Sequence, residues 1–215
     1  MSSNNDLKKQ GRLIAAFGIP GSGKSTTTKN IGKILGIKTY HEPEADKWAK
    51  AVEMRDKIGN FTAIMWFRSM RVPDLHQADF ERRKGETVMV DSYYDKLFFD
   101  YHDKEGIEWL FDQSDEYFDE MVRISKKDRQ LLADADILIF FKLDEQMWKK
   151  FIDHRSRDMD QQAEFRKSFR LQEVFLEVAR AYAASTGCKL IIHEQTFGSA
   201  EKEAEKITKL INESL

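Results

Sequence analysis

Residues 18–25 read Gly18-Ile19-Pro20-Gly21-Ser22-Gly23-Lys24-Ser25, which is a complete phosphate-binding loop. The apolar run at 13–17 precedes it and a helix-compatible stretch at 25–35 follows, so the loop stands in the strand–loop–helix context that the motif requires. Glycines let the backbone aim N–H groups at phosphate oxygens, and the helix adds the positive end of its dipole. The loop predicts a nucleoside triphosphate site. The residues expected to bind the nucleotide are Gly18, Gly21, Ser22, Gly23, Lys24, Ser25 and Thr26.

Five short apolar runs are rich in Val, Ile, Leu and Phe, as parallel strands covered on both faces are. They lie at residues 13–17, 37–40, 87–90, 137–141 and 190–192. Long amphipathic segments separate them, including an expected helix within 110–130, and each of the three prolines is expected near an element boundary or a bend. This alternation predicts an α/β fold with a doubly wound, five-stranded parallel sheet.

The composition narrows the class of protein. We expect one domain at residues 11–215, preceded by a frayed tail at 1–10, because 215 residues with 41% hydrophobic content suit a single core. A net charge of −2 gives no electrostatic case for a nucleic acid polymer or an anionic membrane. The single cysteine, Cys188, excludes a disulfide within the chain. No apolar run resembles a secretory signal or could span a bilayer, so a cytoplasmic location is expected.

Polar residues follow the predicted strands at the sheet edge where open parallel sheets bind ligands. Lys24 is expected to reach the terminal phosphates, while Ser25 and Asp91, the acid after the third strand, are expected to hold Mg²⁺. The alternative for Asp91 is a helix N-cap. Glu42, which Pro43 stiffens at the end of the second strand, is the candidate catalytic base for an acceptor hydroxyl. Its alternative is a structural role.

Two further features suit phosphoryl transfer. Arg155 and Arg157 lie in a polar segment and are expected to form a lid at about 154–165 that closes on the triphosphate, because guanidinium groups pair with phosphate oxygens in two places. The alternative is a solvated charged helix. An aromatic-rich middle offers flat faces for a base or a packed core, and Arg71 with Asp95 offers donors and acceptors for a base edge. The residues predicted to bind the acceptor are Arg71, Asp95, Trp66 and Tyr93.

The loop at 18–25, the Glu42-Pro43 pair, Asp91 and the Arg155-Ser156-Arg157 segment together resemble the deoxynucleoside kinase family, over roughly residues 13–160. The resemblance implies a P-loop kinase in which Glu42 is the base on the sugar 5′-hydroxyl, Asp91 attends Mg²⁺, and the two arginines close over ATP. It also implies a small-molecule nucleoside or nucleotide as partner, and homodimers are common among proteins that look like this.

The sequence departs from that family at two places. The family follows its strand-three acid with Arg-Ser, whereas Ser92 and Tyr93 follow Asp91 here; the related thymidylate kinases use Asp-Arg-Tyr. The family also carries a glutamine for the base where Ile64 stands. Lys96 and Arg68 are the candidates to supply the missing charge.

The sequence therefore predicts an ATP- and Mg²⁺-dependent phosphotransferase that acts on the 5′-hydroxyl of a nucleoside. One alternative is a thymidylate-type nucleoside monophosphate kinase, for which Arg68 and Arg71 are the candidate cations. A small non-nucleoside hydroxyl acceptor is another. The last alternative is an ATP-binding regulator that transfers no phosphate.

Overall fold

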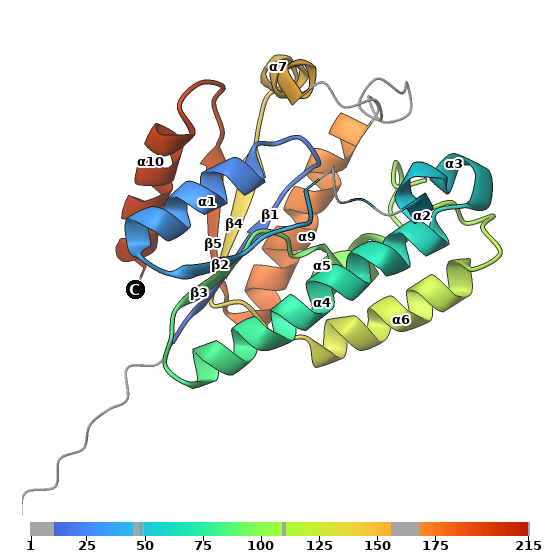
Figure 1. The fold of residues 1–215 in the computed structure, drawn as a ribbon, viewed down its shortest axis with the longest axis horizontal. Helices are drawn as coiled ribbons and strands as arrows, with labels where there is room; N and C mark the ends of the chain where they lie inside the picture. The colour runs from blue at the N-terminus through green and yellow to red at the C-terminus, as the bar shows by residue number, and fades with distance from the viewer. Residues whose placement is uncertain (1–10, 45–47, 49, 109–110, 156–167, 215) are drawn as a thin grey trace, which may run out of the picture.

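A computed structural model of the chain describes residues 11–44, 48, 50–108, 111–155 and 168–214. Five parallel strands form one sheet in the order β2-β3-β1-β4-β5 (Figure 1). The strands are β1 Leu13–Phe17, β2 Lys38–Tyr40, β3 Val88–Val90, β4 Ile137–Lys142 and β5 Lys189–Glu194. All five predicted strands are present, so the predicted α/β fold with a five-stranded parallel sheet is confirmed.

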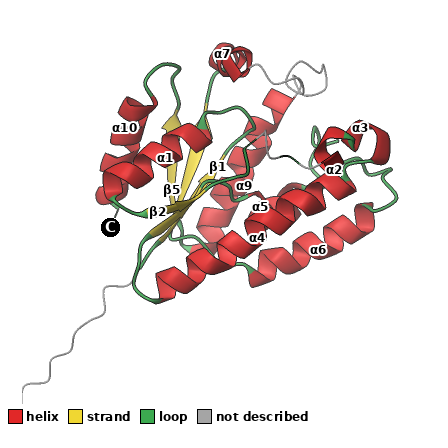
Figure 2. Cartoon of the chain, in the orientation of Figure 1, coloured by secondary structure: helices red, strands yellow, loops and turns green. Residues whose placement is uncertain are grey.

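Helices cover both faces of the sheet (Figure 2). On one face lie α1 Lys24–Leu35 and α10 Ala200–Asn212, and on the other lie α4 Phe61–Arg83, α5 Tyr94–Tyr101 and α9 Leu171–Thr186, with α6 Phe118–Leu131 packed outside α5. The shorter elements are α2 Lys50–Glu53, α3 Arg55–Ile58, α7 Glu145–Arg155 and the 3₁₀ helix η3 Ser168–Arg170. None of the described helices is both long enough and apolar enough to cross a membrane.

The central strand β1 separates two hydrophobic cores. Its five residues are all 0% exposed and alternate between the cores, with Phe17 packed toward α9 and Ala16 toward the α1 and α10 side. Burial of each large side chain contributes about 1.5–3 kcal/mol, so this strand is firmly placed. The phosphate-binding loop that follows it is therefore held at the carboxyl edge of the sheet, between β3 and β4.

Two expectations about helices are wrong. The helix expected from residue 110 begins only at Phe118, because Asp112 accepts hydrogen bonds from the backbone N–H and hydroxyl of Ser114, and Asp115 accepts one from the N–H of Tyr117. Such local side-chain bonds compete with helix formation. Pro73, expected near an element boundary or a bend, lies in the interior of α4.

Candidate active site

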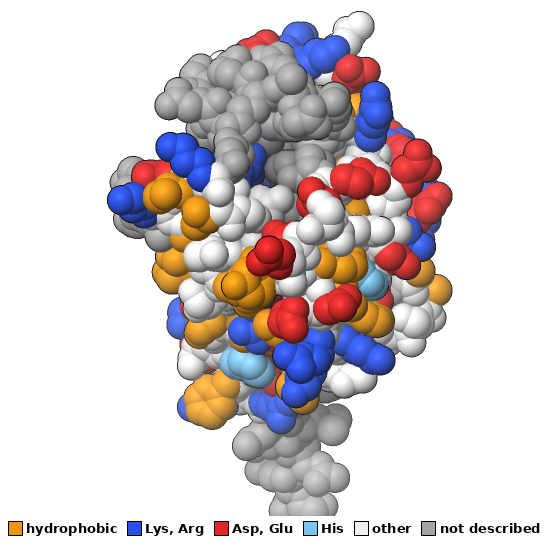
Figure 3. All heavy atoms as spheres, turned by 90° about the vertical axis from the view of Figure 1, so that its right-hand side faces the viewer, with side chains coloured by type: hydrophobic (Ala, Val, Ile, Leu, Met, Phe, Trp, Pro, Cys, Tyr) orange, Lys and Arg blue, Asp and Glu red, His pale blue; other side chains and the backbone are white. Residues whose placement is uncertain are grey.

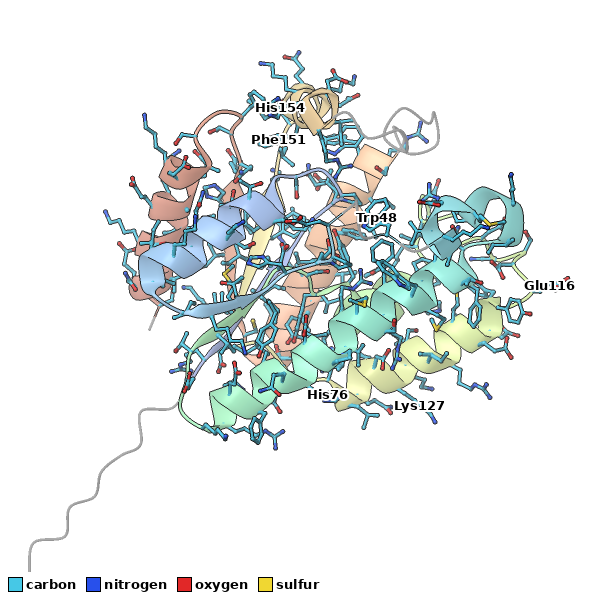
Figure 4. The ribbon with its side chains drawn as sticks, viewed as in Figure 1. Trp48, His76, Glu116, Lys127, Phe151 and His154 are labelled. Carbon is cyan, nitrogen blue, oxygen red and sulfur yellow. The ribbon has the colours of Figure 1, made fainter. Side chains whose placement is uncertain are left out.

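A cavity of about 520 Å³ lies beyond the carboxyl ends of the strands. The phosphate-binding loop, the segment after β2, helices α4 and α5, the end of α7 and the loop after β5 all contribute to its wall. Figure 4 shows Phe151 and His154 on α7 and Trp48 beside α2, and all three line it. Lys24 and Glu42, from separate segments of the chain, both line this cavity.

The phosphate-binding loop is packed tightly against α7. Gly21 and Gly23 have φ angles of 78° and 75°, in the left-handed region that favours glycine. A Cβ on Gly21 would collide with Ile152, and one on Gly23 would come within 2.8 Å of Phe151. Glycine is therefore required at both positions by conformation and by the close approach of α7.

Lys24 begins α1 and is only 6% exposed. Its Nζ donates to the carbonyl oxygens of Gly18 and Ile19 at 3.0 and 2.9 Å and to the Tyr94 hydroxyl at 2.9 Å. Burial lowers the pKa of Lys24 to about 8, although Glu42 and Asp91 act to raise it. Lys24 is therefore a cation at neutral pH, and its charge lies close enough to the carboxylate of Glu42 to interact with it.

That acidic group is held by an arginine. Nη1 of Arg71 donates to Oε1 of Glu42 at 3.1 Å, while Nε and Nη2 donate to the two oxygens of Asp95 at 2.6 and 3.3 Å. Burial alone would lower the pKa of Arg71, but Asp95 and Glu42 outweigh it and the pKa is raised. The structure thus brings Glu42, Arg71 and Asp95, each predicted as a site residue, into one hydrogen-bonded chain.

Asp91 is 1% exposed, and neither of its carboxylate oxygens has a hydrogen-bond partner within the described residues. Among the described residues, the Nδ1 atom of His41 lies 3.8 Å from Oδ2 of Asp91. A buried carboxylate is costly without compensation, so this geometry fits a bound cation or water. Asp91 is not a helix N-cap, because α5 begins at Tyr94 and the N-cap position is Tyr93. No group of three or more His, Cys, Asp or Glu converges on a metal site in the described part of the chain.

Neither of the two aromatic residues predicted to bind the acceptor lines the cavity. Tyr93 is 0% exposed, and its hydroxyl donates to the carbonyl oxygen of Ala133 at 2.6 Å. The ring of Trp66 packs edge-on against Phe67, and it is Phe67 and Tyr94 that face the cavity. In each pair, the ring that faces the cavity is therefore the sequence neighbour of the predicted residue.

The cations expected to replace the missing arginine are also engaged elsewhere. Nζ of Lys96 donates to the carbonyl oxygens of Leu132 and Arg129 and pairs with Asp134 at 3.0 Å. Arg68 binds Asp128 of α6 through two hydrogen bonds of 2.5 and 2.7 Å. The prediction for Lys96 and Arg68 is therefore wrong.

Helix α7 and the loop after β5 form a wall that the sequence interpretation did not identify. Phe197 meets Phe151 and His154 edge-on, with ring centroids 5.1 and 5.5 Å apart. In the same loop, Nε2 of Gln195 donates to Oγ1 of Thr27 at 3.0 Å. The rule that ligands bind at strand ends, applied to the fifth strand, would have pointed to this loop.

The predicted lid is described only in part. Arg155 ends α7 and lines the cavity, whereas Arg157 and the rest of the lid from residue 156 onward lie outside the described residues.

Figure 3 shows acidic and basic side chains interspersed on one face of the molecule, in keeping with the small net charge.

No protein-family model and no curated protein matches the chain. Its fold is similar to that of deoxyadenosine kinase from M. mycoides with bound dATP, at a TM-score of 0.66 and 20% identity over 94% of this chain and 99% of that one. Thymidylate kinase from Candida albicans aligns at a TM-score of 0.56 with 15% identity, covering 95% of this chain and 93% of that one. Shikimate kinase from Acinetobacter baumannii aligns at 0.52 with 15% identity, covering 95% of each chain. The chain therefore has the fold of the P-loop kinases.

Proposed function

We propose that this protein transfers the γ-phosphate of ATP to the 5′-hydroxyl of a nucleoside. The observation that carries the proposal is that Glu42 faces the same cavity as Lys24 and the phosphate-binding loop. A carboxylate opposite a phosphate site is suited to orient an acceptor hydroxyl and to take its proton. The fold of the deoxyadenosine kinase with bound dATP supports the choice of a nucleoside as acceptor.

The donor is bound at the amino end of α1. Backbone N–H groups of residues 21–25 and the helix dipole attract the β- and γ-phosphates, and Lys24 exchanges its carbonyl partners for phosphate oxygens. The aromatic wall of Phe151, His154 and Phe197 encloses the base of the nucleotide. The hydroxyl of Ser25 on the cavity wall and the unpartnered carboxylate of Asp91, which lines a small pocket that shares Glu42 and Arg71 with the cavity, would hold Mg²⁺, which when bound neutralises charge on the phosphate oxygens.

The acceptor occupies the other half of the cavity, against Phe67, Tyr94 and Glu42. The 5′-oxygen forms a bond to the γ-phosphorus while the bond from phosphorus to the bridging oxygen breaks, so ADP leaves with that oxygen. The hydroxyl proton passes to Glu42. Lys24 and Arg155, which both line the cavity, stabilise the charge that develops on the transferred group.

A phosphorylated acceptor is less well supported. Both cations expected to hold its phosphate are engaged, Arg68 by Asp128 and Arg71 by Asp95 and Glu42. A phosphate dianion beside Glu42 and Asp95 would meet two carboxylates that share one guanidinium, which is unfavourable. One observation favours the thymidylate-type alternative: Arg55 of α3 also lines the cavity.

The test is a panel of nucleosides, nucleoside monophosphates and non-nucleoside alcohols incubated with ATP and Mg²⁺, with the products identified by mass spectrometry. We expect a 5′-monophosphate from at least one nucleoside. A diphosphate formed from a monophosphate would select the thymidylate-type alternative. ATP binding without transfer to any acceptor would select the regulator.

A further inference from the structure

A carboxylate that takes a proton from a hydroxyl must be held in one orientation. The residue after Asp91 is Ser92, which carries no charge and whose buried hydroxyl has no hydrogen-bond partner in the described residues. Lys96 and Arg68 are bound to other elements. The sequence comparison suggested Ser92, Lys96 and Arg68 as positions for a cation that could orient Glu42. Within the described residues, none of the three makes a contact that would do so.

Arg71 makes the contact instead. Its guanidinium approaches Glu42 from α4, on the side of the acceptor, and it is fixed from several directions. Asp95 binds two of its nitrogens, and the guanidinium carbon lies 5.3 Å from the ring centroid of Phe67 and 5.6 Å from that of Tyr94. The Arg71 side chain is 14% exposed, so a rearranged guanidinium would have to give up these contacts together.

We propose that Arg71 is the positioning residue for Glu42 in the transfer reaction, and that Asp95 acts on the reaction through Arg71. The inference rests on the proposed function. Arg71 holds Oε1 of Glu42, which leaves Oε2, without a hydrogen-bond partner among the described residues, to accept the hydroxyl proton. Arg71 and Asp95 were predicted to read the edge of a base; in the structure they satisfy each other and the catalytic carboxylate.

The first experiment separates positioning from acceptor binding. Arg71→Ala should lower kcat about 100-fold, because a catalytic group displaced by about 1 Å loses that much, while the Kd of ATP stays within about twofold. Guanidinium ion in the buffer should restore part of the lost kcat. Arg68→Ala is the matched control, since Arg68 lies three residues earlier on α4 and binds Asp128 outside the cavity, and its kcat should stay within about twofold. A rise in the acceptor KM with unchanged kcat would overturn the proposal.

Two further measurements guard against misfolding and against an error in the proposed function. Asp95→Asn keeps the shape of the pair and removes one anchor of Arg71, so kcat should fall about tenfold in a protein that still folds. Crystal structures of the wild type and of Arg71→Ala should show Glu42 in different orientations. If Glu42 has the same orientation in both structures, Arg71 is not its positioning residue, whether or not any nucleoside is phosphorylated. An inactive wild type would refute only the proposed function.

Discussion

Lys24 has a protonation state that can be tested directly. Its pKa is lowered to about 8 in the free protein, so it is charged at pH 7 and loses its charge as the pH rises through 8. Since triphosphate binding favours the charged form, the Kd of ATP should rise roughly fivefold to tenfold between pH 7.5 and 9. Calorimetric titration measures this. In Lys24→Arg the guanidinium stays charged, so the slope should vanish. A flat wild-type profile would mean that Lys24 does not contact the phosphates.

Glu42 is expected to matter for transfer and not for donor binding. Glu42→Gln removes the proton acceptor while keeping the shape of the side chain, so kcat should fall about 10²- to 10⁴-fold with the Kd of ATP nearly unchanged. Glu42→Asp keeps a carboxylate on a shorter side chain, so its kcat should lie between that of the wild type and that of Glu42→Gln. Steady-state kinetics with the best nucleoside of the panel measures both. Undiminished turnover in Glu42→Gln would make Glu42 a structural residue.

A site residue could be predicted where a motif fixes its position in the sequence. It could not be predicted where two adjacent residues of the same type differ in the direction of their side chains. The loop at 18–25 could be identified because its backbone geometry needs particular residues at fixed positions. Tyr93 and Tyr94 could not be told apart, since the first turn of α5 sends one ring into the core and the other into the cavity. Arg71 could be named, but its bond to Glu42 spans 29 positions of sequence and depends on the packing of α4.

The long helix α4 carries Arg71 and contains a proline. Pro73 is exposed and lacks the N–H that would bond one turn back, a loss that ordinarily costs about 3 kcal/mol in a helix interior. Pro73→Ala also makes the unfolded chain more flexible, so we expect a net gain of about 1–2 kcal/mol and a Tm higher by about 3–6 °C. His76→Ala, exposed on the same helix (Figure 4), is the control and should change stability by less than about 0.5 kcal/mol. An unchanged or lower Tm for Pro73→Ala would show that the packing of α4 needs the proline.

At the scale of elements, strands were easier to predict than helix boundaries. The three central strands, β1, β3 and β4, are buried on both faces and form apolar runs, and the bounds of all five strands differ from the predicted ones by at most two residues. The start of α6 was misplaced because turns formed by Asp112 and Asp115 override a helical period in the sequence. The aromatic wall formed by α7 and the loop after β5 depends on contacts between distant segments, which no single window of sequence contains.

At the scale of the molecule, segments far apart in the chain build one cavity. The phosphate-binding loop follows the first strand and Phe197 follows the last, yet both line the same cavity of about 520 Å³, and residues of α4 and α5 line it as well. Cavities of roughly 300–1,000 Å³ hold small ligands, and in the proposed reaction this one cavity would hold both donor and acceptor.

A ligand that joins donor and acceptor should therefore bind far more tightly than either alone. An adenosine and a nucleoside linked through their 5′-oxygens by four phosphates provide the three phosphates of ATP and one more for the gap across which transfer occurs. Linkage converts the second contact into an intramolecular one, so the affinity should exceed that of ATP by about 10²- to 10⁴-fold. The five-phosphate compound fits an acceptor that already carries a phosphate, and it should bind more weakly here because Arg68 and Arg71 are engaged. Tighter binding of the five-phosphate compound, measured by calorimetry, would place a monophosphate in the acceptor site.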